Sequence, residues 1–94
     1  PYLDSKLILL KLRSTQGRVT NLQQLSGARL GVRADYAYGV DFAAVPNLRL
    51  VEENHLIQNL LNLLNGKVHF VIGDKRTVIF QLDEFMKDKK HKFV

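Results

Sequence analysis

Several residue types are absent or scarce, and each absence excludes a class of protein. The chain has no cysteine and no tryptophan, and it has only two prolines in 94 residues. Without cysteine it has no disulfide framework, thiolate metal site or thiol nucleophile. No apolar run approaches the roughly 18 residues that a membrane-spanning helix needs, and no signal peptide is visible. The hydrophobic fraction of 46% and the charged fraction of 24% are ordinary for a globular protein.

The length allows one domain, which we take to span residues 1–94. The chain begins at Pro1 rather than at a methionine. We therefore expect it to be a processed or excised piece of a longer protein.

Positive charge is concentrated near the end of the chain. The run "KDKKHK" at 87–92 supplies +3 of the net charge of +5. Such a run is usually a solvated helix end. The alternative is a basic interaction module, but nucleic-acid binding requires a basic face, and no second cluster accompanies this one. We expect no nucleic-acid partner.

Apolar patterning predicts strands alternating with helices. Strands are expected at 5–13, 28–33, 48–53 and 67–73, with one helical turn near 21–26. Helices are expected at 35–45, with Asp35 as N-cap, at 53–66 and at 74–90. Residues 91–94 form either a closing strand or an exit from the domain. This order predicts an α/β fold: a three-layer α-β-α arrangement with a mainly parallel central sheet and helices on both faces.

The two later helices have apolar faces. In the helix at 53–66 the polar side chains fall on one stripe, opposite the leucines; these polar residues are Gln58, Asn59, Asn62 and Asn65. In the helix at 74–90 the apolar face consists of Val78, Ile79, Leu82, Phe85 and Met86.

Ligands of open α/β sheets bind beyond the carboxyl ends of the strands, and two polar junctions occupy such places. The first runs from Arg33 to Tyr38, where Arg33 and the start of a helix would hold a carboxylate or phosphate and the tyrosines would offer rings and hydroxyls. In the alternative interpretation Asp35 caps the helix, one tyrosine packs and Arg33 is solvated. The second junction is 73–76, where Asp74 either accepts hydrogen bonds from a ligand ammonium or caps the last helix.

No catalytic set is recognisable, so we expect a protein that is not an enzyme. The serines lack a nucleophile elbow, and Glu52 and Glu53 point to opposite faces of a strand. His55 and His69 lack metal-ligand spacing, and His69 is expected to be structural. Dinucleotide and Walker motifs are absent, so no cofactor and no metal are expected.

The two junctions match a known family over nearly the whole chain. The blocks "LQQLSGARLGVRADYAYG" at 22–39 and "LLNLLNGKVHFVIGD" at 60–74 resemble, in order and spacing, the second lobe of type II periplasmic solute-binding proteins, in the family that serves polar amino-acid ABC transporters. "PYLDSKLILLKLR" at 1–13 looks like the crossover into that lobe, and "KFV" like the start of the way back.

The resemblance implies a ligand clamp in which two lobes close over a small polar, amino-acid-like solute. It places the ligand carboxylate at Asp35, Tyr36, Ala37 and Tyr38, and the ligand ammonium at Asp74. Asp35 and Ala37 replace the glycine and the serine or threonine that are common in the family. The implied partners are the missing first lobe and the membrane subunits of an ABC transporter, and the implied location is periplasmic. The alternative is a periplasmic sensor domain of the same fold, whose partner is a signalling domain.

Overall fold

Four strands form one mainly parallel sheet at the centre of the molecule. The computed structural model describes residues 6–15 and 17–93. The strands are β1 (Leu7–Leu10), β2 (Arg29–Arg33), β3 (Arg49–Glu53) and β4 (Phe70–Asp74), in the spatial order β1-β4-β2-β3. Strand β2 pairs in parallel with both β3 and β4, whereas β1 runs antiparallel to β4. The carboxyl ends of β2 and β4 therefore lie side by side at one edge of the sheet.

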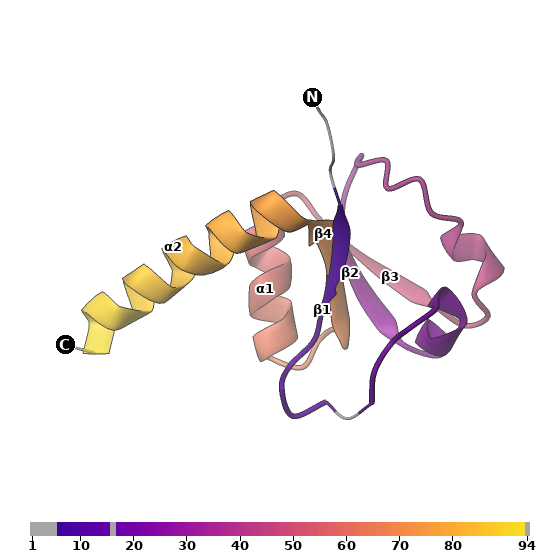
Figure 1. The fold of residues 1–94 in the computed structure, drawn as a ribbon, viewed down its shortest axis with the longest axis horizontal. Helices are drawn as coiled ribbons and strands as arrows, with labels where there is room; N and C mark the ends of the chain where they lie inside the picture. The colour runs from indigo at the N-terminus through magenta and orange to yellow at the C-terminus, as the bar shows by residue number, and fades with distance from the viewer. Residues whose placement is uncertain (1–5, 16, 94) are drawn as a thin grey trace.

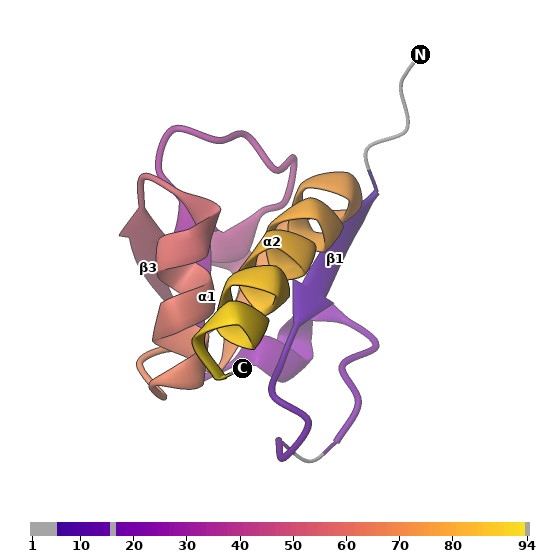
Figure 2. The same cartoon turned by 90° about the vertical axis from the view of Figure 1, so that its left-hand side faces the viewer.

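The two faces of the sheet are covered differently (Figures 1 and 2). Helices α1 (Leu56–Leu64) and α2 (Lys75–Phe93) cover one face, and the outer part of α2 extends away from the sheet. The opposite face is covered by loops and by two short 3₁₀ helices, η1 (Leu22–Leu25) and η2 (Phe42–Ala44). The expected turn near 21–26 is confirmed as η1, where the Gln24 side chain accepts a hydrogen bond from the Asn21 backbone N–H at 3.1 Å.

Successive side chains of β2 and β4 point to opposite faces of the sheet, so each face has its own hydrophobic core, as expected for strands buried on both sides. On the η1–η2 face, β2 and β4 contribute Leu30, Val32, Phe70 and Ile72 to a cluster that also contains Leu25 and Val45. On the helical face, Val71 packs with residues of α1 and α2 and the segment between α1 and β4; these are Leu56, Leu60, Leu63, Val68 and Val78. The sheet is thus the shared wall of two cores.

The prediction of a helix at 35–45 is wrong. Asp35 has φ 61° and lies in a turn, and the following chain is irregular until η2, whose N-cap is Asp41. Asp35 therefore caps no helix, and the helix N-terminus that was expected to hold an anion after β2 is absent. The closing strand considered for 91–94 is also wrong where the structure describes it, because α2 continues to Phe93.

Two of the four polar residues in the stripe expected on α1 are buried, and the other two, Gln58 and Asn65, are exposed. Asn59 is fully buried and Asn62 nearly so, whereas Leu61 and Leu64 are about half exposed. Asn59 Nδ2 donates to the Val32 carbonyl at 3.0 Å, and Asn62 Nδ2 donates to Asn59 Oδ1 at 3.1 Å and to Glu53 Oε2 at 2.9 Å. This network ties α1 to the ends of β2 and β3.

The apolar face expected on α2 is only partly covered. Val78 is fully buried and Leu82 is partly buried, but Ile79 and Met86 are exposed, as is Phe80. Val78 lies in the first turns of α2, close to Gly73 of β4, whereas Met86 lies in the second half of the helix.

Candidate functional site at the carboxyl ends of β2 and β4

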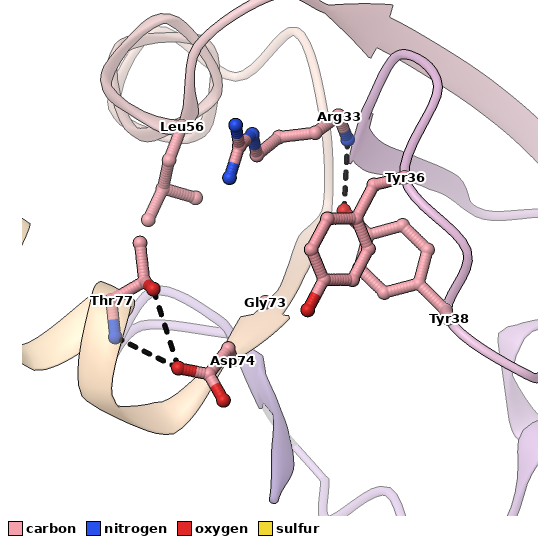
Figure 3. A pocket seen from close by; sticks show the side chains of 7 residues that line it. All are labelled: Arg33, Tyr36, Tyr38, Leu56, Gly73, Asp74 and Thr77. Carbon is pink, nitrogen blue, oxygen red and sulfur yellow. Dashed lines mark hydrogen bonds between the residues drawn. The ribbon is translucent and has the colours of Figure 1, made fainter. Parts of the chain in front are cut away.

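The two polar junctions come together at one edge of the sheet. Arg33 is the last residue of β2 and Asp74 the last of β4, and these strands are neighbours. A narrow crevice of about 10 Å³ lies between the two junctions (Figure 3). Its lining comprises Arg33, Tyr36, Tyr38, Leu56, Gly73, Asp74 and Thr77. This volume holds about one water molecule, so a larger ligand would lie over the crevice rather than within it.

The loop after β2 is folded back by its own tyrosines. The Tyr38 hydroxyl accepts a hydrogen bond from the Arg33 backbone N–H at 2.9 Å. The ring centroids of Tyr36 and Tyr38 are 4.5 Å apart, and Tyr38 meets Phe42 edge-on at 6.1 Å. Burial raises the pKa of Tyr38, while its hydrogen bond with Arg33 and the Arg33 charge act in the opposite direction. Tyr38 therefore anchors the loop, and Tyr36, at 39% exposed, presents its ring to solvent.

Arg33 carries hydrogen-bonding capacity that the described residues do not use. Its Cζ lies 5.7 Å from the centroid of the Tyr36 ring, a cation–π distance. Its Nε is buried and has no hydrogen-bond partner among the described residues. Within that part of the chain the guanidinium also makes no salt bridge. A buried donor without a partner costs about 1–3 kcal/mol, so a ligand oxygen placed there would recover a desolvation cost that the fold already carries.

Asp74 caps the last helix, as one of the two sequence interpretations predicted. Its Oδ2 accepts hydrogen bonds from Thr77 N at 3.1 Å and from Thr77 Oγ1 at 3.2 Å, as Figure 3 shows. Both capping bonds use the same oxygen, so Oδ1 has no hydrogen bond within the part of the chain that the structure describes. A hydrogen bond from a ligand to Oδ1 would therefore not compete with the cap.

The six site residues predicted from the sequence divide into two groups. Arg33, Tyr36, Tyr38 and Asp74 line the crevice, whereas Asp35 and Ala37 are exposed and outside its lining. Leu56, Gly73 and Thr77 were missed. For Thr77 a signal existed, since a threonine three residues after a capping aspartate lies on the same side of the helix start.

Gly73 brings β4 and α2 close together at the crevice. A Cβ at this position would lie 2.8 Å from Val78 Cγ2. Only a residue without a side chain permits this approach, and the approach sets where the first turn of α2 stands relative to Asp74.

A second, larger cavity adjoins the crevice. It measures about 200 Å³ and lies between the starts of α1 and α2. Its lining comprises Arg33, His55, Leu56, Ile57, Thr77 and Gln81. Three of these residues also line the crevice, so the two spaces share a wall formed by Arg33, Leu56 and Thr77.

His69 and the basic run contribute no further chemistry in the described residues. His69 Nδ1 accepts a hydrogen bond from the Arg29 backbone N–H at 2.9 Å, which confirms its structural role. The part of the chain that the structure describes contains no cluster of three or more potential metal ligands and no helix apolar and long enough to cross a membrane. Of the run at 87–92, Lys87 pairs with Glu84 at 3.6 Å, and the other side chains lie outside the described ones.

The sheet and its flanking helices have the fold of a substrate-binding protein of amino-acid ABC transporters. The chain aligns with a crystal structure described as the substrate-binding protein of an amino acid ABC transporter, with a TM-score of 0.71 and 15% identity over 87% of the chain. It aligns with holo ArgBP from T. maritima with a TM-score of 0.76 and 17% identity over 89% of the chain. The same values hold for the arginine-bound form of truncated ArgBP.

The match is to part of each of those proteins. The chain spans 36%, 37% and 40% of the three solved structures, which is less than half of each. No protein-family model and no curated protein matches the chain. The structural likeness confirms the predicted fold class. It also supports the predicted resemblance to a lobe of such a protein, as a likeness of fold.

Proposed function

We propose that the chain is a ligand-binding lobe of an extracytoplasmic solute-binding protein that serves an ABC transporter. The observation that carries the proposal is the meeting of Arg33, Tyr36 and Asp74 at the carboxyl ends of two adjacent parallel strands. Open α/β sheets bind ligands at this edge. The site offers a carboxylate for an ammonium group, and tyrosines and an arginine for polar or anionic groups, which suit a small polar solute such as an amino acid.

The narrowness of the crevice fits one half of a clamp. A space for about one water molecule cannot enclose a solute, so the second half of the enclosure has to come from another lobe. The proposed partners are therefore that lobe and the transporter's membrane subunits, with a periplasmic location. A sensor domain would use the same lobe and the same site, and the binding test below applies to both.

Nuclear magnetic resonance of the ¹⁵N-labelled 94-residue chain tests the site directly. The chain is titrated with a panel of amino acids and small polar cations at concentrations high enough to detect weak binding. We expect at least one solute to shift the backbone amides of 33–38 and 73–77. The amides of Gly27 and Arg49, which line a separate cavity beside Asn47 and Leu48, serve as the internal control. If no solute of the panel moves the 33–38 and 73–77 signals, the proposal is wrong.

A further inference from the structure

The structure assigns the cavity beside Arg33 to the side chain of the ligand, and we infer that this side chain carries a carboxylate. The inference rests on the proposed function and goes further by naming the substrate class, amino acids with an acidic side chain. The observation that carries it is the second cavity, of about 200 Å³, which shares Arg33 with the crevice.

The position of this cavity makes it the extension of the proposed site. In the proposed arrangement the ammonium group of the ligand meets Asp74, and its α-carboxylate faces the loop that contains Tyr36 and Tyr38. The side chain then needs a separate space. The crevice is too small for it, whereas the cavity across the shared wall of Arg33, Leu56 and Thr77 is about twenty times larger.

The lining of the cavity is suited to an anion. Its polar residues are Arg33, His55, Thr77 and Gln81, and it contains no aspartate or glutamate. Arg33 Nε is buried and has no hydrogen-bond partner among the described residues. Arginine holds carboxylates through paired, charge-assisted hydrogen bonds, which are the strongest of the common polar contacts.

The backbone adds to the same preference. Leu56 and Ile57 line the cavity and begin helix α1, where the first N–H groups have no acceptor within the helix. The positive end of the α1 dipole therefore adjoins the cavity. A cationic side chain would meet the Arg33 charge in this space, so arginine and lysine are disfavoured as ligands.

The test compares isosteric ligands on the wild-type chain by the same NMR titration. We expect glutamate to bind about tenfold more tightly than glutamine, because a hydrogen bond to a charged group is stronger than one to a neutral amide. We expect arginine to bind more weakly than either. The Arg33 Nε–Hε signal, which reports directly on the unpartnered donor, should shift with glutamate and not with glutamine.

Two variants with matched controls locate the effect. Gln81→Glu places a carboxylate in the cavity and should remove the preference for glutamate, whereas Gln23→Glu makes the same charge change on the exposed side of η1 and should retain it. Arg33→Gln should make glutamate and glutamine equivalent, whereas Arg49→Gln, at an exposed position on the edge strand β3, should not. Amide spectra of each variant establish that it is folded.

The outcomes separate this inference from the proposed function. Equal binding of glutamate and glutamine, or tighter binding of arginine, would overturn the acidic side chain while leaving the solute-binding lobe intact. A preference for glutamate that survives Gln81→Glu would place the acidic group elsewhere and overturn the assignment of the cavity. If no amino acid shifts the signals at either junction, the proposed function fails and the inference fails with it.

Discussion

Tyr38 links the end of β2 to the loop that follows it, and its ionisation should weaken the fold. Burial raises its pKa above the ordinary tyrosine value of 10.0, so the folded state holds the phenolic proton more tightly than the unfolded state does. The contribution of the protonated Tyr38 to the unfolding free energy is therefore fully present below pH 10.0. It is lost as the pH rises above 10.0 and passes through the raised pKa of the folded state.

The Tyr38→Phe variant isolates this effect. It should lose about 1–3 kcal/mol of unfolding free energy at neutral pH, because the Arg33 N–H keeps its burial and loses its acceptor. Above pH 10.0 the unfolding free energy of the variant should decrease less with rising pH than that of the wild type. Urea unfolding of both proteins across alkaline pH measures both quantities. Parallel pH profiles for variant and wild type would show that Tyr38 does not titrate with a raised pKa.

At Gly31 in β2, helix α1 approaches the sheet closely. A Cβ there would lie 2.7 Å from both Cγ and Oδ1 of Asn59. Asn59 is fully buried and fixed by its hydrogen bonds, so it cannot move aside. Gly31→Ala should therefore cost about 1–3 kcal/mol, as overpacking usually does.

A double-mutant cycle with Asn59→Ala checks this contact. The cost of Gly31→Ala should fall in the Asn59→Ala background, because the clashing atoms are gone. Urea unfolding midpoints of the two single variants and the double variant supply the comparison. Additive costs would mean that the alanine is accommodated by some other movement of the chain.

Asn59 also shows why sequence periodicity misjudged one face of α1. The helical pattern of polar and apolar residues counts asparagine as polar and assigns it to solvent. Here the amide satisfies the Val32 carbonyl beside Gly31, where the absence of a side chain leaves room for it. Only the pairing of a glycine in one element with an asparagine in another makes this burial favourable, and single-element patterns contain no such information.

At the scale of elements, the strands and the two long helices could be predicted, and the connection between β2 and β3 could not. Composition favoured a helix after Arg33, but Asp35 takes a left-handed conformation and Gly39 does so as well. The Tyr38 hydroxyl bonds back to the Arg33 N–H and closes the loop before a helix can start. Tyr36 and Tyr38, which line the crevice, were therefore among the predicted residues, whereas the irregular loop that carries them was not predicted.

Asp74 joins two elements, and its two roles can be separated by substitution. Asn is as good an N-cap as Asp, so Asp74→Asn should change the unfolding free energy by a few tenths of a kcal/mol. Asp74→Ala should cost about 1 kcal/mol. Both variants should lose ligand affinity, because neither retains a charge for the ammonium group.

Thermal unfolding followed by circular dichroism, together with the NMR titration, measures the two effects for each variant. Full ligand affinity in Asp74→Asn would show that the carboxylate serves only as a cap. Equal stability of the asparagine and alanine variants would show that the cap contributes little to α2.

At the scale of the molecule, the alternation of strands and helices indicated a mainly parallel sheet but could not give the strand order. The antiparallel β1 at the edge beside β4 is set by contacts between segments about 60 residues apart. The convergence of the two junctions follows from the parallel pairing of β2 with β4. It was predictable because parallel strands place their carboxyl ends at the same edge.

The sheet separates two cores, and this arrangement predicts that both unfold together. The strands β2 and β4 supply residues to both faces, so losing either core exposes the sheet that supports the other. Leu30→Ala on one face and Leu60→Ala on the other should each cost about 2–5 kcal/mol. Leu22→Ala, at a position 37% exposed on η1, should cost much less.

Two probes report on opposite faces of the sheet. The chain has no tryptophan, so its intrinsic fluorescence comes mainly from its three tyrosines, of which Tyr38 packs against the core on the η1–η2 side. Far-ultraviolet circular dichroism reports chiefly on α1 and α2. We expect coincident urea transitions for wild type and for both core variants, each shifted to lower urea as a whole. Separate transitions, with Leu30→Ala moving only the fluorescence curve and Leu60→Ala only the dichroism curve, would show that the two cores fold independently across the sheet.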